Sequence, residues 1–197
     1  MRHQVPPRLN HLLYSTPFPR KSLPKSGKIF GIVSVRPVGY NKRVGEKNLK
    51  VLLQRVTSAT VSVASEEVGR IGPGLVVFVG VANGDTEKDI QYLVPKMLGL
   101  RIFENKEGKF DLSVTDDKGE LLIVSQFTLL ADTRKGRRPS FTDAAPQTQA
   151  EALFKQFVEQ ARASGLKVET GRFQQYMQVE IHNDGPVTIL LDSRQKS

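Results

Sequence analysis

Four consecutive residues, Ser125-Gln126-Phe127-Thr128, follow a short apolar run, Leu121–Val124, which is typical of a buried strand. A strand that ends in Ser and Thr exposes hydroxyls and backbone N–H groups at a sheet edge. Such N–H groups can stabilise the oxyanion of an acyl-transfer reaction. The same groups can also do no more than satisfy local hydrogen bonds at a strand end. The spacing alone favours the second interpretation.

A basic loop follows this segment. Its four cations fall within five residues, at Arg134, Lys135, Arg137 and Arg138. Closely spaced cations on a loop interrupted by glycine and proline are suited to contact with RNA phosphates. Asp132 and Asp143 flank the run and weaken its field, and charge runs are common on solvated loops. Phosphate binding and simple solvation therefore both remain open.

Near the carboxyl end, Asn183–Thr188 predicts a turn between two strands, Met177–Asn183 and Val187–Leu191. The Gly185-Pro186 pair within it allows a second interpretation. An X-Pro bond adopts the cis form at modest cost, and a cis Gly-Pro aims its carbonyls in directions that a trans bond does not reach. The turn could therefore act as a steric gate.

The inventory of catalytic side chains is poor. The chain has no cysteine, which excludes disulfides, thiolate metal sites and a cysteine nucleophile. Of its three histidines, only His182 lies outside the first 48 residues, and strand alternation places it on the polar face beside Glu180, as expected of a solvated surface residue. A Ser-His-Asp triad and a multi-histidine metal site are thus disfavoured, and we expect neither metal nor cofactor.

The elements that must position these segments follow from periodicity. Alternating or apolar runs predict further strands at Val51–Val56, Ala59–Val63, Val68–Ile71, Leu75–Val81 and Leu166–Glu169. Helical spacing of apolar residues predicts one helix after Asp85-Thr86 and another over Thr148–Ser164. Their inward residues would be Ile90, Leu93, Val94, Met97 and Leu98, and Leu153, Phe154, Phe157, Val158 and Ala161. Strand-rich ends with two helices between them favour one layered α/β domain over residues 49–193, followed by a tail at residues 194–197.

The amino-terminal stretch differs from the rest. Residues 1–45 carry nine basic side chains and no acidic one, so the formal net charge of +9 belongs to them and the remainder is formally neutral. Residues 1–48 also hold six of the eleven prolines, which predicts a disordered basic extension. It could be a transit peptide, an RNA-attracting tail or sequence upstream of the true start. No apolar run approaches the ~20 residues that span a bilayer. We therefore expect no membrane association and a soluble, cytoplasmic protein, unless the extension directs it to a plastid or mitochondrion.

Taken together, Ser125–Leu129 and Asn183–Thr188 resemble the paired signature of the D-aminoacyl-tRNA deacylase family, in order and about 55 residues apart. Further stretches that fit the family are Leu53–Val56, Gly84–Thr86, Arg134–Phe141 and Leu166–Gly171. The resemblance covers Leu49–Ser193. Because Leu49 falls where relatives begin with methionine, residues 1–48 are predicted to be dispensable.

The resemblance implies a β/β/α layered fold and a homodimer with active sites at the subunit interface. Each site would accept the aminoacylated 3′ end of a transfer RNA and hydrolyse the ester of a D-amino acid, or of glycine mischarged on tRNA(Ala). This activity amounts to chiral proofreading in translation. The resemblance also implies that a cis Gly185-Pro186 bond reaches into the partner's pocket and excludes L-amino acids by carbonyl clash, with Asn183 and Arg55 supporting it.

The remaining site residues are assigned by the same resemblance. Ser125, Gln126 and Phe127 would present main-chain groups to the substrate, and Thr128 would line the pocket; Arg134, Lys135, Arg137 and Arg138 would contact the transfer RNA. The family is expected to use the ribose 2′-hydroxyl of the RNA to help activate water, which agrees with the scarcity of histidine and cysteine. This sequence departs from the family at Phe173–Met177, where relatives have Phe-Gly-Ala before the methionine, and at Leu130, where tyrosine is common.

Two other function classes are compatible with parts of the sequence. A non-catalytic RNA-binding module would bind transfer RNA through the basic loop without turnover. A threonine- or serine-based esterase would act on small esters without RNA and would depend on Thr128. Neither explains the paired signature.

Overall fold

A single long strand, β1 (Lys50–Val63), organises the part of the chain that the structure describes. The computed structural model describes residues 48–195. β1 pairs antiparallel with β3 (Gly74–Gly80) along its first half and with β2 (Glu66–Ile71) along its second half. The two strands predicted at Val51–Val56 and Ala59–Val63 are thus one strand. Pairing with β8 along the other edge of β1, at Val56 on one side of Thr57 and at Ser58 on the other, carries the strand through this position with a shift of register.

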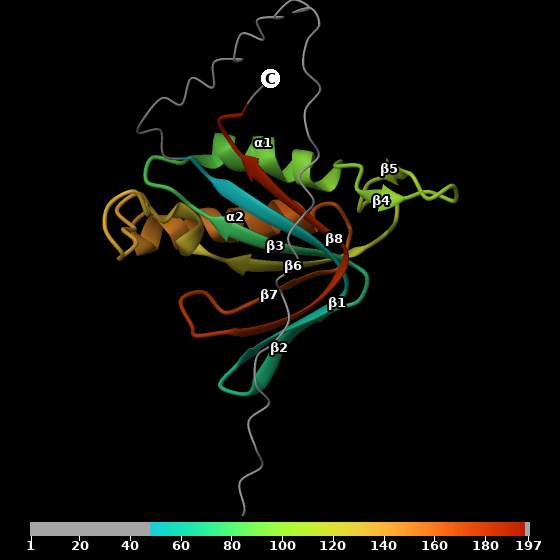
Figure 1. Ribbon diagram of the computed structural model, residues 1–197, viewed down its shortest axis with the longest axis horizontal. Helices are drawn as coiled ribbons and strands as arrows, with labels where there is room; N and C mark the ends of the chain where they lie inside the picture. The colour runs from blue at the N-terminus through green and yellow to red at the C-terminus, as the bar shows by residue number, and fades with distance from the viewer. Residues whose placement is uncertain (1–47, 196–197) are drawn as a thin grey trace, which may run out of the picture. The chain divides into compact units, whose positions relative to one another are not determined.

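The centre of the sheet is parallel. β6 (Glu120–Ser125) pairs parallel with β3, and β7 (Val168–Thr170) pairs parallel with β6, which gives the order β2-β1-β3-β6-β7 with β8 (Gln178–Asp192) on the other edge of β1 (Figure 1). Val76 and Val77 are fully buried, as are Leu122 and Ile123, so both faces of β3 and β6 are covered there. Continuous apolar runs are typical of such strands, and the predictions for these two are confirmed.

Two helices, α1 (Glu87–Leu98) and α2 (Gln147–Arg162), pack on one face of this sheet (Figure 1). Nine of the ten predicted inward residues are buried; the exception, Leu98, packs at the edge of the core. Asp89 accepts hydrogen bonds from the backbone N–H of Thr86 at 2.8 Å and from its hydroxyl at 3.1 Å, which fixes the start of α1. No helix within residues 48–195 is long and apolar enough to span a membrane.

A second apolar cluster lies on the opposite face of the sheet. It contains Val56, Ala59, Val61, Ile71, Val76, Leu122 and Val124. The second half of β1, together with β2 and the first half of β8, supplies a further layer of strands that packs on β3 and β6. The order of layers is therefore strand, strand, helix.

β8 corrects one prediction. Asn183–Thr188 was predicted to be a turn between two strands, but β8 runs through it as one strand from Gln178 to Asp192. Gln54 of β1 pairs with Thr188 and Val56 pairs with Asn183, so Arg55 stands opposite the four residues 184–187, which bulge out of the ladder. The Gly185-Pro186 bond within this bulge is cis. Pairing with β1 on both sides of the bulge keeps β8 one strand. These partners lie far away in the sequence, so a local turn signal such as Gly-Pro does not reveal them.

Two short strands, β4 (Phe103–Glu104) and β5 (Phe110–Leu112), form a hairpin of their own beyond α1. Its base is set in the main core through Ile102 and Phe103, which are 5% and 6% exposed. The periodicity of the sequence predicted no strand in this region. The predicted extension over residues 1–48 lies outside the described residues except for Asn48.

Candidate active site at the ends of β3 and β6

A cleft of about 1040 Å³ opens where β3 and β6 end. Its floor includes Val79 and Ser125, which pair across the two strands. Its walls come from the start of α2 and from residues 173–177. Carboxyl ends of parallel strands are frequent ligand sites, because the loops that follow them converge there.

Three of the four residues in the first predicted segment, Ser125, Gln126 and Phe127, line one side of this cleft, and Thr128 lies next to them outside the lining. Ser125 ends β6, and the chain then turns into a 3₁₀ helix, η1 (Phe127–Leu130). The backbone N–H of Gln126 donates to the carbonyl of Val79 at 2.8 Å, which holds the turn against β3. Gly80 permits this approach, because a Cβ there would lie 3.0 Å from the carbonyl oxygen of Gln126 and 3.1 Å from Cβ of Leu129. Ser125, Gln126 and Phe127 thus line the cleft at the start of η1. The first N–H groups of a helix have no hydrogen-bond partner inside that helix.

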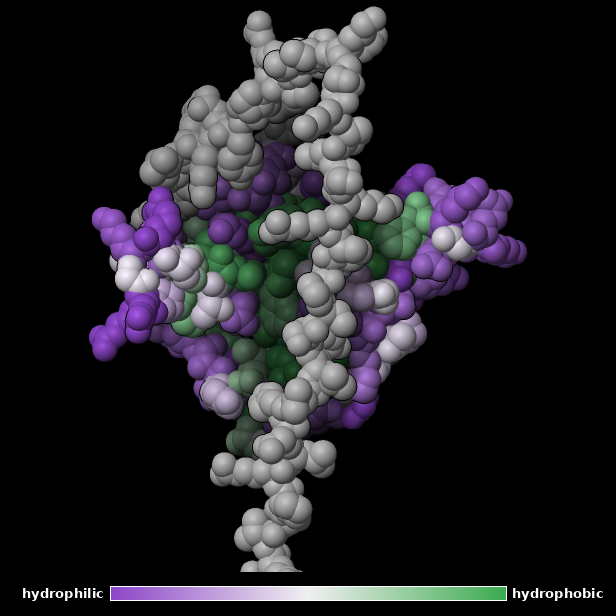
Figure 2. Space-filling model, in the orientation of Figure 1, coloured by the Kyte–Doolittle hydropathy of each residue, from purple (hydrophilic) through white to green (hydrophobic). Residues whose placement is uncertain are grey.

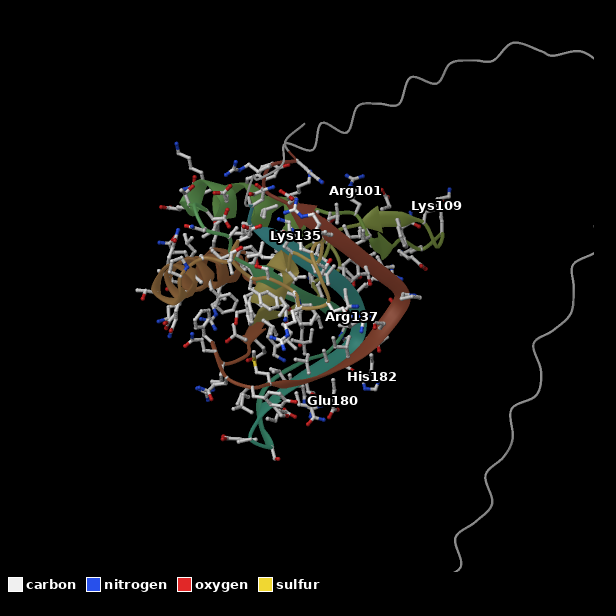
Figure 3. All side chains as sticks on the ribbon, turned by 60° about the vertical axis from the view of Figure 1, so that its left-hand side comes forward. Arg101, Lys109, Lys135, Arg137, Glu180 and His182 are labelled. Atoms are coloured by element: carbon white, nitrogen blue, oxygen red, sulfur yellow. The ribbon has the colours of Figure 1, made fainter. Side chains whose placement is uncertain are left out.

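Thr128 lacks the partners that a nucleophile needs. Its hydroxyl accepts a hydrogen bond from the side-chain amide of Gln126. His182, the one imidazole among residues 48–195, is exposed and pairs with Ser58 of β1, and its side chain and that of Glu180 point outward from β8 (Figure 3). No group of three or more His, Asp or Glu side chains within residues 48–195 is arranged to hold a metal ion. The described residues therefore bring no general base to Thr128.

The basic loop lies beside this segment. Backbone hydrogen bonds of 2.8 and 2.9 Å join Asp132 to Ser140 and close the loop at its base. Phe141, which follows, packs edge-on against Phe127 with ring centroids 5.0 Å apart. Phe127 itself remains 57% exposed. The loop and the cleft thus share an aromatic contact.

The four cations of the loop are not equivalent. Arg134 donates to Asp132 from Nε at 2.8 Å and from Nη2 at 2.6 Å, and these bonds hold the pKa of Asp132 below its usual range. No ion pair joins Lys135, Arg137 or Arg138 to another residue of the described part of the chain, and Figure 3 shows Lys135 and Arg137 on the loop. Three cations therefore remain available for an external anion, whereas Arg134 is already neutralised locally.

The departing residues Phe173–Met177 form the opposite wall. Gln174 has a φ of +61°, a region that favours glycine, and its side-chain carbonyl accepts a hydrogen bond from the side-chain amide of Gln147 on α2. This hydrogen bond joins the two parts of the chain that wall the cleft, residues 173–177 and the start of α2. Tyr176, on the same segment, is 93% exposed. Sequence reasoning flagged Phe173–Met177 but missed Gln147, because nothing in its local sequence links it to position 174.

The second predicted segment lies elsewhere. Arg55, opposite the 184–187 bulge, pairs with Leu75 at the far end of β3 from Val79. Four residues of strand correspond to about 13 Å. Gly185 and Pro186 are both exposed, and neither lines the cleft of its own chain. The fold therefore brings Arg55, Asn183, Gly185 and Pro186 together but keeps them apart from Ser125–Thr128.

An uncovered apolar row crosses the sheet between these two places. Leu190, Leu52, Phe78 and Val124 pair in sequence across β8, β1, β3 and β6, on the face away from the helices. Leu190 is 52% exposed, and Leu52 and Phe78 are only partly buried, whereas Val124 at the β6 end of the row is buried; the uncovered part is therefore Leu190, Leu52 and Phe78. Figure 2 shows hydrophobic residues gathered over the middle of the surface that faces the viewer, with hydrophilic residues around them. An apolar strip of this kind is typical of a surface that binds a partner.

Comparisons with known proteins agree with one another. A model of the family described as D-Tyr-tRNA(Tyr) deacylase matches residues 52–192. A D-aminoacyl-tRNA deacylase of Dehalococcoides mccartyi is 55% identical over 148 residues, which are 75% of this chain and 97% of that protein. A D-aminoacyl-tRNA deacylase of Thermotoga petrophila is 56% identical over 145 residues, 74% of this chain and 97% of that protein.

Solved structures match the same part of the chain. A protein described as c-Myc DNA unwinding element binding protein has a TM-score of 0.69 and 45% identity, and the match covers 72% of this chain and 97% of that one. A probable eukaryotic D-amino acid tRNA deacylase has a TM-score of 0.67 at 20% identity, covering 74% of this chain and 99% of that one, and shows a shared fold.

Proposed function

The chain belongs to the D-Tyr-tRNA(Tyr) deacylase family and is a D-aminoacyl-tRNA deacylase, and we propose that it removes D-amino acids and mischarged glycine from transfer RNA while sparing L-amino acids, at a site shared by two copies of the chain. The observation that carries this proposal is the separation of the two signature segments. The cleft and the 184–187 bulge occupy opposite ends of one sheet.

The chemical step is assigned to main-chain groups and to the substrate. Ser125, Gln126 and Phe127 would present main-chain groups to the ester. The N–H of Gln126 already donates to Val79, so a backbone N–H that faces the charge developing on the carbonyl oxygen would come from Phe127 rather than from Gln126. Thr128 would line the site rather than attack, because its hydroxyl has no basic partner within residues 48–195. The ribose 2′-hydroxyl of the terminal adenosine would help to activate water. This division of roles needs no metal and no cofactor.

Selectivity is assigned to Gly185 and Pro186. Both residues are exposed, and their bulge projects from the ladder at the edge of the sheet. Gly185 has a φ of +112°, and a Cβ there would lie 2.9 Å from Cγ2 of Val187, so the segment is shaped around glycine. A rigid carbonyl placed against Cα of the substrate would clash with an L side chain and leave the D side chain outside. Glycine, which lacks a side chain, would be accepted as well.

In a homodimer, the 184–187 bulge of one copy could lie beside the Ser125–Thr128 segment of the other, although the two are far apart within one chain. The bulge of one copy would complete the cleft of the other, and the row Leu52–Phe78–Leu190 is apolar surface that a second copy would cover. Active sites at a subunit interface follow from this arrangement, with Asn183 and Arg55 supporting the bulge from within its own chain.

The transfer RNA is assigned to the basic loop. Lys135, Arg137 and Arg138 carry charges with no ion-pair partner among residues 48–195, next to the aromatic pair Phe127 and Phe141. Cations beside exposed aromatic rings suit the phosphates and bases of a single-stranded 3′ end. Arg134 would contribute less to this contact, because Asp132 already binds it. The cytoplasmic location and the dispensability of residues 1–48 stay predictions.

The test is turnover of matched esters. Purified protein is given D-tyrosyl-, L-tyrosyl- and glycyl-transfer RNA, and the first-order loss of each ester is measured. We expect rapid loss of the D and glycyl esters and little loss of the L ester. Equal rates on the D and L esters of one transfer RNA would refute the proposal. Binding without turnover would indicate an RNA-binding module, and turnover of D-tyrosine methyl ester without RNA would indicate a small-ester hydrolase.

A further inference from the structure

Arg55 is a buried cation whose partners come from two separate parts of the chain. It is 5% exposed, and its Nη1 donates to the carbonyl of Ile102 at 2.6 Å. Its Nε lies 2.8 Å from a carboxylate oxygen of Asp184, and its Nη2 lies 3.7 Å from one of Glu104. The contact with Asp184 is an ion pair without hydrogen-bond geometry, since Nε makes no hydrogen bond to a described residue; the planar guanidinium is thus hydrogen-bonded at Nη1 and held by charge at Nε. Arg55 therefore joins the bulge, through Asp184, to the start of the β4–β5 hairpin.

The hairpin also covers a face of the guanidinium. The carbon Cζ of Arg55 lies 5.2 Å from the ring centroid of Phe110, the first residue of β5. Phe110 is 54% exposed, so its ring is not held there by burial in the core. A cation over an aromatic face is attractive, more so when the cation is desolvated as here. This contact gives the exposed ring of Phe110 a role.

The hairpin is a firm base for these contacts. The side-chain oxygen of Asn105 accepts hydrogen bonds from the N–H groups of Glu107 at 2.9 Å and Lys109 at 3.1 Å, which shape the turn between β4 and β5. Ile102 and Phe103 anchor its base in the main core. The carbonyl of Ile102, the acceptor for Arg55, is therefore fixed by the core rather than by the surface.

The bulge has no comparable support of its own. Gly185 and Pro186 are exposed, and they interrupt the pairing of β8 with β1. Nη2 of Arg55 lies 3.5 Å from where a Cβ of Gly185 would stand, so the guanidinium lies directly against the bulge. Within residues 48–195, the hairpin reaches the bulge through this arginine.

We infer that the β4–β5 hairpin positions the 184–187 bulge through Arg55, and that Phe110 and Asp184 are positioning residues which determine how strictly L-aminoacyl esters are excluded. The inference rests on the proposed function. Exclusion by clash depends on where a carbonyl stands, and a displacement of a fraction of an ångström relieves it. A D ester does not meet that carbonyl with its side chain. Loosening the bulge should therefore raise the rate on L esters and leave the rate on D esters nearly unchanged.

The experiment compares two variants with two matched controls in the full-length protein. Phe110→Leu removes the ring but keeps an apolar side chain, and Asp184→Asn removes the charge at constant shape. Phe110→Tyr keeps the ring. Asp111→Asn removes the partner of Arg101, an ion pair of 3.1 Å on the same hairpin whose arginine points away from the sheet (Figure 3). Single-turnover rates on D-tyrosyl- and L-tyrosyl-transfer RNA are measured for each protein, with thermal unfolding to verify folding.

We expect the ratio of D to L rates to fall about tenfold in Phe110→Leu and in Asp184→Asn, through faster L hydrolysis. The ratio should be unchanged in Phe110→Tyr and Asp111→Asn. Because both positions act through Arg55, the double variant should lose less than the product of the two single effects. A wild-type ratio in both folded single variants, or losses that multiply in the double variant, would overturn the inference. A wild-type protein without D/L selectivity would instead overturn the proposed function.

Discussion

At the end of β6, the cleft is lined by Ser125, Gln126 and Phe127 together with apolar and uncharged polar side chains, and no carboxylate, amine, guanidinium or imidazole is among its lining residues. At the other end of the sheet, the 184–187 bulge is built around a buried arginine with a carbonyl, two carboxylates and an aromatic ring around it. The cleft, to which hydrolysis is assigned, thus has no charged side chain in its lining, whereas the bulge, to which selectivity is assigned, is built around charged side chains. Under the proposed function, hydrolysis would use dipoles and groups of the substrate, whereas the exclusion of L-amino acids would need a rigid support.

The largest effect should come from the substrate and not from the protein. Replacing the terminal adenosine by its 2′-deoxy form removes the group assigned to activate water, and we expect D-tyrosyl ester hydrolysis to slow by at least ~100-fold. Thr128→Ala should keep its rate within about threefold, because Thr128 is assigned to the lining of the site and not to proton transfer. Single-turnover rates of the wild type on the 2′-deoxy substrate and of Thr128→Ala on the normal substrate decide between catalysis by the 2′-hydroxyl and catalysis by Thr128. An inactive Thr128→Ala protein that acts normally on the 2′-deoxy substrate would restore side-chain catalysis at the cleft.

An intermediate effect is expected at the bulge. Arg55→Met removes the cation, leaves the buried carbonyl of Ile102 without its donor and frees Asp184. We expect the free energy of unfolding to fall by about 1–3 kcal/mol and the D/L rate ratio to fall at least ~10-fold.

The matched control for that change is Arg101→Met. Arg101 pairs with Asp111 at 3.1 Å, but its side chain is 69% exposed. Its loss should change the free energy of unfolding by no more than about 0.5 kcal/mol and leave the D/L ratio unchanged. Equal effects of the two substitutions in urea unfolding and in the rate ratio would remove the distinction between the two ends.

Periodicity in the sequence was sufficient for the parts of the fold that local pattern controls. The helices α1 and α2 bury the residues predicted from their spacing, and β3 and β6 are buried as continuous apolar runs. The bulge was beyond this reasoning. A Gly-Pro pair ordinarily predicts a turn, and the pairs that keep β8 continuous lie on β1, more than 100 residues earlier.

The site shows the same limit. The segment Ser125–Thr128 could be located from a run of neighbours, because a buried strand ending in Ser and Thr is a local signal. Arg55 could be singled out only through a family resemblance, since its partners Ile102, Glu104, Phe110 and Asp184 are scattered along the chain. The β4–β5 hairpin, which supplies Glu104 and Phe110, has strands too short to show a periodic pattern.

The smallest effect concerns a buried charge with no assigned role in the reaction. Asp85 is 2% exposed, and burial raises its pKa to about 6, although the N–H of Ala82 donates to it at 2.6 Å. Asp89 raises this pKa further, and Arg194 lowers it. Because the folded pKa lies above the unfolded value, folding favours the protonated form. The stability that this gives is present at low pH and is lost as pH rises through about 6.

Asp85→Asn should therefore be more stable than the wild type by about 1 kcal/mol at pH 8, with the difference shrinking towards pH 4. Urea unfolding at several pH values measures this. The pH profile of D-ester hydrolysis should be the same in both proteins, because Asp85 does not line the cleft. A rate profile that shifts with this substitution would place a titrating side chain at the end of the sheet that we describe as free of one.

The bulge in β8 has a consequence for how the protein can vary over evolutionary time. Residues 178–182 of β8 hold one register with residues 58–62 of β1, and residues 188–192 hold a different register with residues 50–54, so the two segments of strand are aligned independently. A one-residue slip in an ordinary strand turns every side chain to the wrong face. A bulge between two pinned segments absorbs such a change locally. Substitutions, and even a change of length, between Asn183 and Thr188 can therefore reshape the bulge, and with it the selectivity that we propose for it, without disturbing the scaffold on which the cleft is built.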